Sequence, residues 1–137
     1  MNAIVVGTDG SPGAEAAVRK VIELAQGKGA TVHLVCAYPG KSALERIGMT
    51  ARQDSVDLRG VAADVLARDE RKLDEAGFAV EKHVREGDPA HVIIEVAGED
   101  TDLIVVGARG STGVRHMLGS VSIKLAHHAP ASLLIVQ

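Results

Sequence analysis

The chain has 137 residues, a formal net charge of −3, 46% hydrophobic residues and 24% charged residues, which is typical of a globular protein and excludes wholesale disorder. No apolar run approaches the roughly 20 residues of a membrane-spanning helix, and the first residues lack the pattern of a signal peptide. The acidic balance and the scarcity of aromatic residues, Tyr38 and Phe78 alone, argue against nucleic-acid binding. One cysteine, Cys36, allows no internal disulfide and fits a cytoplasmic location.

Short apolar runs rich in β-branched residues alternate with segments whose apolar residues recur at helical spacing. The first run, residues 3–8, is apolar on both faces, as expected of a strand that is buried on both sides. Ser11 and Pro12 suit the N-cap and the first position of a helix. Gly27 is expected to end this helix.

The remaining elements are predicted by the same patterns. They are a strand over residues 31–37, a loop over about 38–54, a helix over about 55–76, a half-exposed strand over 78–85, a short helix from Asp88-Pro89 to Gly98, a strand over 103–106, a helix over 119–128 and a strand over 131–136. The alternation predicts an α/β fold: a single doubly wound domain over residues 1–137, in which a five-stranded parallel sheet carries helices on both faces.

Two of the predicted strand ends carry the residues of a candidate ligand site, because open doubly wound sheets bind ligands beyond these ends. Thr8-Asp9-Gly10-Ser11 follows the first strand, and a glycine-bearing loop over residues 107–118 follows the fourth. Gly119-Ser120-Val121-Ser122 then opens the last helix, whose N-terminus offers unpaired donors to an anion. With the cations Arg109 and Arg115, this pattern predicts a phosphate cradle. It is neither a Walker motif nor the dinucleotide fingerprint.

These motifs, as a set and in this order, resemble the universal stress protein family over nearly the whole chain. The matching segments are IVVGTDGS at residues 4–11, DLIVVGARG at 102–110, GSVS at 119–122 and HAP at 128–130. The resemblance implies the strand order 3-2-1-4-5 and a cytoplasmic dimer. One branch of the family binds ATP through G-x2-G-x9-G-S/T, and another branch lacks this motif and does not bind ATP. Here eight residues, not nine, separate Gly110 from Gly119.

The resemblance also implies which residues contact the nucleotide. Asp9 would contact the nucleoside, the backbone of Ala37 would meet the adenine, and Mg2+ would be held by phosphates and water. The ribose and phosphates would lie along residues 107–110 and 119–122. The full implied set is Thr8, Asp9, Ala37, Gly107, Arg109, Gly110, Gly119, Ser120, Val121 and Ser122.

Other interpretations of these residues need no ligand. Asp9 can satisfy the turn before the first helix, Ser120 can be the N-cap of the last helix, and Arg109 and Arg115 can be solvated surface charges. Cys36 lies in an apolar strand and is expected to be a core residue rather than a nucleophile.

No metal site is predicted, because the histidines show no ligand spacing with a cysteine or a second histidine. The histidines concerned are His33, His83, His91 and His116. His127-His128 is explained by a helix C-terminus, where positive charge is favourable. The charged residues of the helix over 55–76 are expected to form a solvated face: Arg59, Asp64, Arg68, Asp69, Glu70 and Arg71.

The predicted strand over residues 131–136 has no charged residue. At the edge of a sheet it would invite aggregation unless it were covered, so a homodimer that pairs this strand with its own copy is expected. The edge strand over 78–85 is instead protected by charged side chains.

Three functions remain open at this stage. The leading one is an ATP-binding regulatory protein of the stress response that acts as a nucleotide-responsive dimer. The second is a dimeric interaction protein that does not bind ATP, or a relative that prefers cyclic AMP, because the shorter loop suits one phosphate. The third is an enzyme, at most a slow ATP hydrolase, since no residues are marked as a catalytic acid and base.

Overall fold

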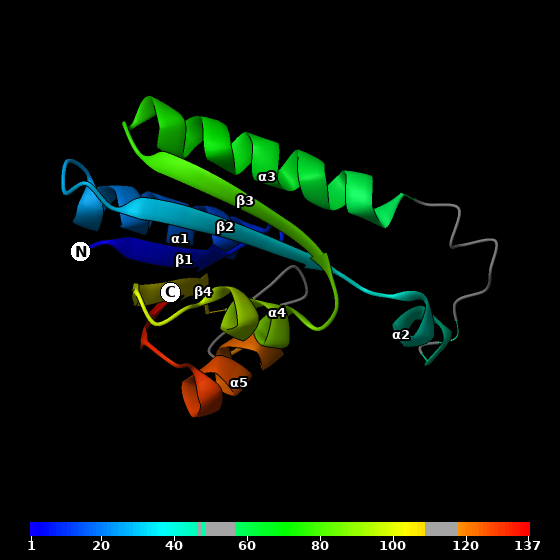
Figure 1. The fold of residues 1–137 in the computed structure, drawn as a ribbon. Helices are drawn as coiled ribbons and strands as arrows, with labels where there is room; N and C mark the ends of the chain where they lie inside the picture. The colour runs from blue at the N-terminus through cyan, green and yellow to red at the C-terminus, as the bar shows by residue number, and fades with distance from the viewer. Residues whose placement is uncertain (47, 49–56, 109–117) are drawn as a thin grey trace.

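The computed structural model describes residues 1–46, 48, 57–108 and 118–137. Its elements in chain order are β1 (Ala3–Gly7), α1 (Pro12–Ala25), β2 (Thr31–Tyr38), α2 (Lys41–Arg46), α3 (Leu58–Glu75), β3 (Ala79–Glu86), α4 (Pro89–Val96), β4 (Thr101–Gly107), α5 (Ser120–His128) and β5 (Ser132–Val136) (Figure 1). Within this part of the chain, no helix combines the length and the apolar character needed to cross a membrane.

The five strands form one parallel sheet in the order β3-β2-β1-β4-β5. This confirms the α/β fold class and the strand order that the family resemblance implies. The sheet edges are β3 and β5, as expected. Consecutive side chains of a strand point to opposite faces, and β1 shows this: Val6 packs into one core cluster and Val5 into the other.

Helices cover both faces of the sheet. The first core cluster joins α1 and α3 to the sheet through fully buried residues such as Val18, Leu66 and Leu73. The second cluster joins α4 and α5 to the opposite face through Ile93 and Leu125. Each strand of the centre is therefore buried on both sides, which explains why its sequence is apolar throughout.

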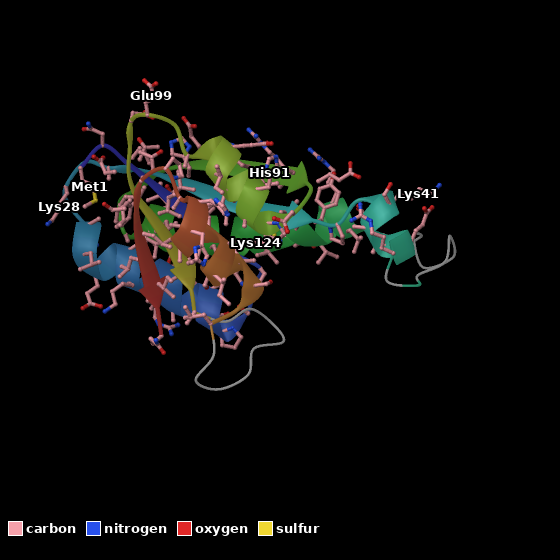
Figure 2. All side chains as sticks on the ribbon, turned by 90° about the horizontal axis from the view of Figure 1, so that it is seen from below. Met1, Lys28, Lys41, His91, Glu99 and Lys124 are labelled. Carbon is pink, nitrogen blue, oxygen red and sulfur yellow. The ribbon has the colours of Figure 1, made fainter. Side chains whose placement is uncertain are left out.

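Side-chain caps fix where the helices begin. The Ser11 hydroxyl accepts a hydrogen bond from the backbone N–H of Ala14 at 3.2 Å, with Pro12 at the first helical position. In α4 the Asp88 carboxylate accepts from the N–H of His91 and also pairs with Lys124 of α5 at 3.1 Å. Figure 2 views this face of the molecule, with His91 on α4 and Lys124 on α5.

The structure corrects the predicted loop over residues 38–54. A short helix, α2, occupies its first part and buries Leu44. Six residues with one buried apolar side chain show too little periodicity to be recognised in the sequence. The next helix, α3, begins at Leu58 with Asp57 as its N-cap, rather than at about residue 55. Residues 47 and 49–56 lie outside the described part of the chain.

Candidate functional site

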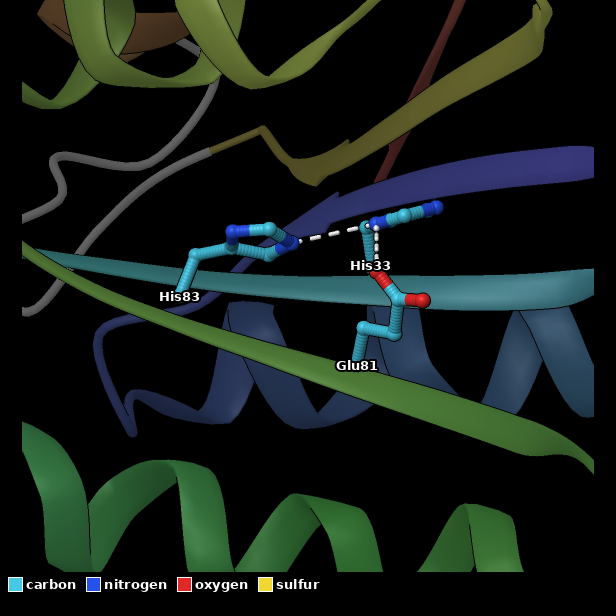
Figure 3. A group of neighbouring side chains, drawn as sticks. All are labelled: His33, Glu81 and His83. Carbon is cyan, nitrogen blue, oxygen red and sulfur yellow. Dashed lines mark hydrogen bonds and ion pairs between the residues drawn. The ribbon is translucent and has the colours of Figure 1, made fainter.

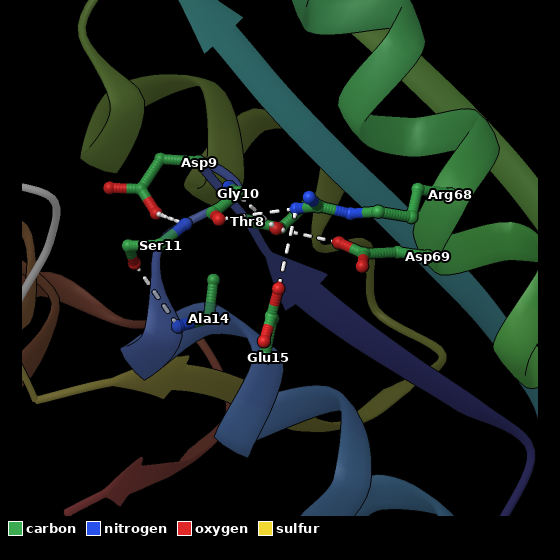
Figure 4. A network of polar contacts seen from close by, with 8 residues as sticks. All are labelled: Thr8, Asp9, Gly10, Ser11, Ala14, Glu15, Arg68 and Asp69. Carbon is green, nitrogen blue, oxygen red and sulfur yellow. Dashed lines mark hydrogen bonds and ion pairs between the residues drawn. The ribbon is translucent and has the colours of Figure 1, made fainter.

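Thr8 connects the end of β1 to two neighbouring elements. Its backbone N–H donates to the carbonyl oxygen of Val35 in β2 at 2.9 Å. Its buried hydroxyl donates to Oδ2 of Asp69 in α3 at 2.7 Å and accepts from the N–H of Gly10 at 3.3 Å (Figure 4). Thr8 therefore fixes the direction in which the chain leaves the sheet.

The turn after Thr8 is held by the side chain of Asp9. The N–H of Ser11 donates to Oδ1 of Asp9 at 2.9 Å, and Asp9 itself is exposed at the carboxyl edge of the sheet. The turn-forming role considered for Asp9 is thus present in the structure. An exposed carboxylate fixed by a turn is also well placed to meet a polar ligand, so the two roles are compatible.

Two residues of α3 belong to this site, although the sequence analysis assigned them to a solvated face. Asp69 is 0% exposed, and its Oδ1 has no hydrogen-bond partner among the described residues. Arg68 donates to the carbonyl oxygen of Gly10 at 3.1 Å and lies 3.7 Å from Glu15 (Figure 4). The prediction of a solvated face is wrong for Asp69, which shares its helical spacing with the buried Leu66 and Leu73.

Cys36 lies in the core beneath this turn. Burial raises the pKa of its thiol to about 11, and the charges of Asp9 and Asp69 act in the same direction. The thiol is therefore protonated at neutral pH, whereas a nucleophile needs the thiolate. This agrees with the expectation that Cys36 is a core residue.

The end of β4 approaches the start of α1 so closely that only glycine fits. A Cβ atom at Gly107 would lie 2.6 Å from the carbonyl carbon and 2.7 Å from the carbonyl oxygen of Gly13. These are distances that real Cβ atoms essentially never show, and they involve backbone rather than a flexible side chain. This contact joins the two strand ends that the sequence marked as a candidate site.

Hydrogen bonds join the start of α5 to the end of β4. The N–H of Gly119 donates to the carbonyl oxygen of Ala108 at 2.7 Å. The buried Ser122 hydroxyl donates to the carbonyl oxygen of Gly107 at 2.9 Å, with that of Ala108 at 3.2 Å. The single hydrogen of this hydroxyl is therefore engaged by the backbone, so Ser122 stabilises the strand end.

The N-cap of α5 is Gly119, and among the described residues no side chain caps this helix by a hydrogen bond. Ser120 is the first helical residue and is exposed. The alternative role of Ser120 as an N-cap is therefore wrong. The first N–H groups of α5 have no side-chain acceptor at the cap position, which is the arrangement that accommodates anions at helix N-termini.

The predicted site residues of the described chain thus gather at the carboxyl edge of the sheet. Thr8 and Asp9 follow β1, Gly107 ends β4, and the tetrapeptide 119–122 opens α5. Ala37 lies near the end of β2, two residues beyond Val35, the register partner of Gly7. The predicted residues Arg109 and Gly110, as well as Arg115 and His116, lie outside the described residues.

The strand order and the helices on both faces define a doubly wound α/β protein, a class in which ligands bind beyond the carboxyl ends of the strands. The chain belongs to the universal stress protein family, whose model matches residues 1–137. The match confirms the family that the sequence motifs predicted.

Curated relatives carry the same family name. A universal stress protein of Methanothermobacter thermautotrophicus is 49% identical over 55 residues, which are 39% of this chain and 38% of the relative. The universal stress protein Rv1636 of Mycobacterium tuberculosis is 31% identical over 138 residues, 97% of this chain and 94% of the relative. The chain spans less than half the length of the first relatives that it matches, at 38%, 45% and 45%.

Solved structures share the fold. The protein MJ0577 superposes with a TM-score of 0.84 at 25% identity and covers 98% of this chain and 94% of its own. A universal stress protein in complex with cAMP superposes with a TM-score of 0.71 at 27% identity, covering 99% of this chain and 96% of its own.

Proposed function

We propose that this protein is an adenine-nucleotide-binding regulatory protein of the stress response, with ATP as its ligand. The observation that carries the proposal is the convergence of the two strand ends, where Gly107 touches Gly13 and α5 begins without a side-chain cap. The contact holds the two strand ends together, and the start of α5 offers backbone N–H groups to phosphates. The related structure that holds cAMP supports an adenine nucleotide as the class of ligand.

Five of the predicted residues have a defined task in this proposal. The exposed carboxylate of Asp9 contacts the nucleoside, and the backbone of Ala37 meets the adenine. Ser120 holds phosphates through its N–H group and its exposed hydroxyl, while Gly119, whose N–H donates to Ala108, fixes the start of α5. Ser122 positions the strand end, because its hydroxyl hydrogen is already engaged. Mg2+ fits as an ion held by the phosphates and water, since it usually keeps several waters.

The same proposal includes a cytoplasmic homodimer that pairs β5 with its own copy. β5 is an edge strand that pairs with β4 alone among the described strands. Its residues Leu133, Leu134 and Ile135 are only half-buried, and it carries no charge. Pairing two such strands about a twofold axis covers both edges. A nucleotide then regulates the dimer only if it binds two states of the protein with different affinity.

Cyclic AMP is the second candidate ligand. It is favoured by the cAMP complex of the 27% identical neighbour and by the eight residues between Gly110 and Gly119. A ligand with one phosphate needs fewer donors from this loop than a triphosphate does. Competition between ATP and cAMP for one site discriminates the two ligands.

The test is calorimetric titration of the nucleotide-free protein with ATP, ADP and cAMP, after mass spectrometry of any nucleotide released on denaturation. Ser120→Ala is expected to weaken binding, because it removes a hydroxyl from the exposed start of α5. Ser42→Ala is the matched control, since Ser42 is an exposed serine of α2 and belongs to neither the proposed nucleotide site nor the proposed dimer strand. No heat with any nucleotide at millimolar concentration would refute the proposal and favour a dimeric interaction protein.

A further inference from the structure

His33, Glu81 and His83 form a polar cluster on β2 and β3. In the parallel register His33 is the partner of Glu81, and Val35 is the partner of His83. The three side chains share one face of the sheet, because their strand neighbours Leu34 and Val84 pack against the opposite face. Figure 3 shows the three side chains turned toward one another. Fifty residues separate the two histidines in sequence, so no local spacing reveals this cluster.

The ligand atoms of the cluster lie at the separations that a metal ion requires. Nδ1 of His33 is 3.0 Å from Nε2 of His83 and 3.3 Å from Oε2 of Glu81. One ligand atom from each residue lies within 4.8 Å of the other two. Tetrahedral Zn2+ with bonds of about 2.0–2.1 Å places neighbouring ligand atoms about 3.3 Å apart. Small side-chain rotations therefore suffice to bind an ion.

The cluster is partly buried at His33 and exposed to solvent at Glu81. The side chain of His33 is 21% exposed and that of Glu81 is 63% exposed. The two histidine rings stack with centroids 5.3 Å apart. Their positions come from two paired strands rather than from a loop, which limits the conformational freedom lost on binding. The exposed side of Glu81 leaves access for an ion and for a water molecule as a fourth ligand.

The charge of the cluster also suits a divalent cation. Two neutral imidazoles and one carboxylate carry a net charge of −1. The nearest cation on the same strand face, Arg85, lies 3.7 Å from Glu95 of α4, so its charge is partly offset. Two histidines and one glutamate are ligands that Zn2+ commonly takes with water. We propose that His33, Glu81 and His83 form a binding site for a divalent transition metal of the Zn2+ class.

This site is distinct from the nucleotide site proposed above. It shares no residue with that site: the cluster lies at His33 of β2 and at Glu81 and His83 of β3, whereas the nucleotide residues follow β1 and β4, open α5 and include Ala37 near the end of β2. The competing explanation is a metal-free cluster, in which one hydrogen on Nδ1 of His33 is shared between Nε2 of His83 and Oε2 of Glu81. That explanation predicts no ion affinity above the background of surface histidines.

The experiment uses the full chain without a histidine tag, after treatment with a chelator. Zn2+ is titrated by calorimetry, and Co2+ is titrated by visible absorption to report the number and geometry of ligands. One ion per chain is expected. His83→Gln and Glu81→Gln are each expected to weaken binding at least about tenfold, by analogy with changes around other metal sites. His91→Gln is the matched control, because His91 also pairs with a glutamate but belongs to no such cluster among the described residues.

Histidine ring signals in NMR spectra of the unmodified protein give a measurement that needs no variant. Zn2+ is expected to shift the signals of His33 and His83 first, before those of His91, His127 and His128. Absence of saturable binding refutes the site. Binding that survives both His83→Gln and Glu81→Gln refutes it equally, because the ion then lies elsewhere.

Discussion

The contact between Gly107 and Gly13 makes a sharp prediction for Gly107→Ala. The added methyl group would lie 2.6 Å from the carbonyl carbon of Gly13, whereas carbon atoms pack at about 3.5 Å. The end of β4 and the start of α1 must then separate by roughly 0.9 Å, a displacement of the kind that costs about 1–3 kcal/mol in a packed core. With a urea dependence of about 1.5 kcal/mol per M, the unfolding midpoint should fall by about 0.7–2 M.

Gly98→Ala is the matched control, because it makes the same chemical change where space exists. A Cβ atom there meets only the end of the Asp100 side chain, at 3.1 Å. The free energy of unfolding of this variant should equal or slightly exceed that of the unmodified protein, since alanine lowers the entropy of the unfolded chain. Nucleotide affinity should fall in Gly107→Ala alone. Equal stability and equal affinity in the two variants would refute the role assigned to the contact.

Three further predictions concern other contacts. Thr8→Val leaves the buried Asp69 without its hydroxyl donor and should cost about 1–3 kcal/mol in urea unfolding; unchanged stability would contradict this. Backbone N–H groups of Ala3 and Asn2 lower the pKa of Asp102, so its stabilisation is complete above the unfolded pKa and is lost as pH falls through the folded one. The stability advantage of the unmodified protein over Asp102→Asn should therefore shrink below about pH 4, and a pH-independent difference would disprove it. Leu134→Lys should yield a monomer by light scattering, whereas Leu24→Lys on the exposed side of α1 should not; an unmodified protein that is monomeric would reject the β5 dimer.

The sequence predicted most of the fold because its signals are local. Each strand is a short apolar run, and caps such as Ser11 and Asp88 mark where helices begin. The helix α2 was not predicted, because its six residues bury only Leu44 and therefore show no repeating apolar pattern. Local patterns therefore suffice wherever an element is long enough to repeat its buried positions.

The candidate site was predicted less completely, because parts of it depend on contacts between distant residues. Asp69 was assigned to a solvated face on its residue type, although its spacing places it on the buried stripe of α3. His33 and His83 meet only through the register of β2 and β3. Contacts of this kind depend on how the strands pair, and the spacing of residues along the chain does not predict that pairing.

The hydrogen bond from the N–H of Gly119 to the carbonyl oxygen of Ala108 joins the start of α5 directly to the end of β4. The position of α5 on the sheet therefore does not depend strongly on the number of residues between them. Closing a loop of ten rather than eleven residues changes the free energy by only about 0.1 kcal/mol. Insertion or deletion of one residue there is therefore expected to leave the stability of the fold nearly unchanged. The end of β4 and the start of α5 are held together by their own hydrogen bonds, so their geometry is expected to tolerate a change in the number of residues between them.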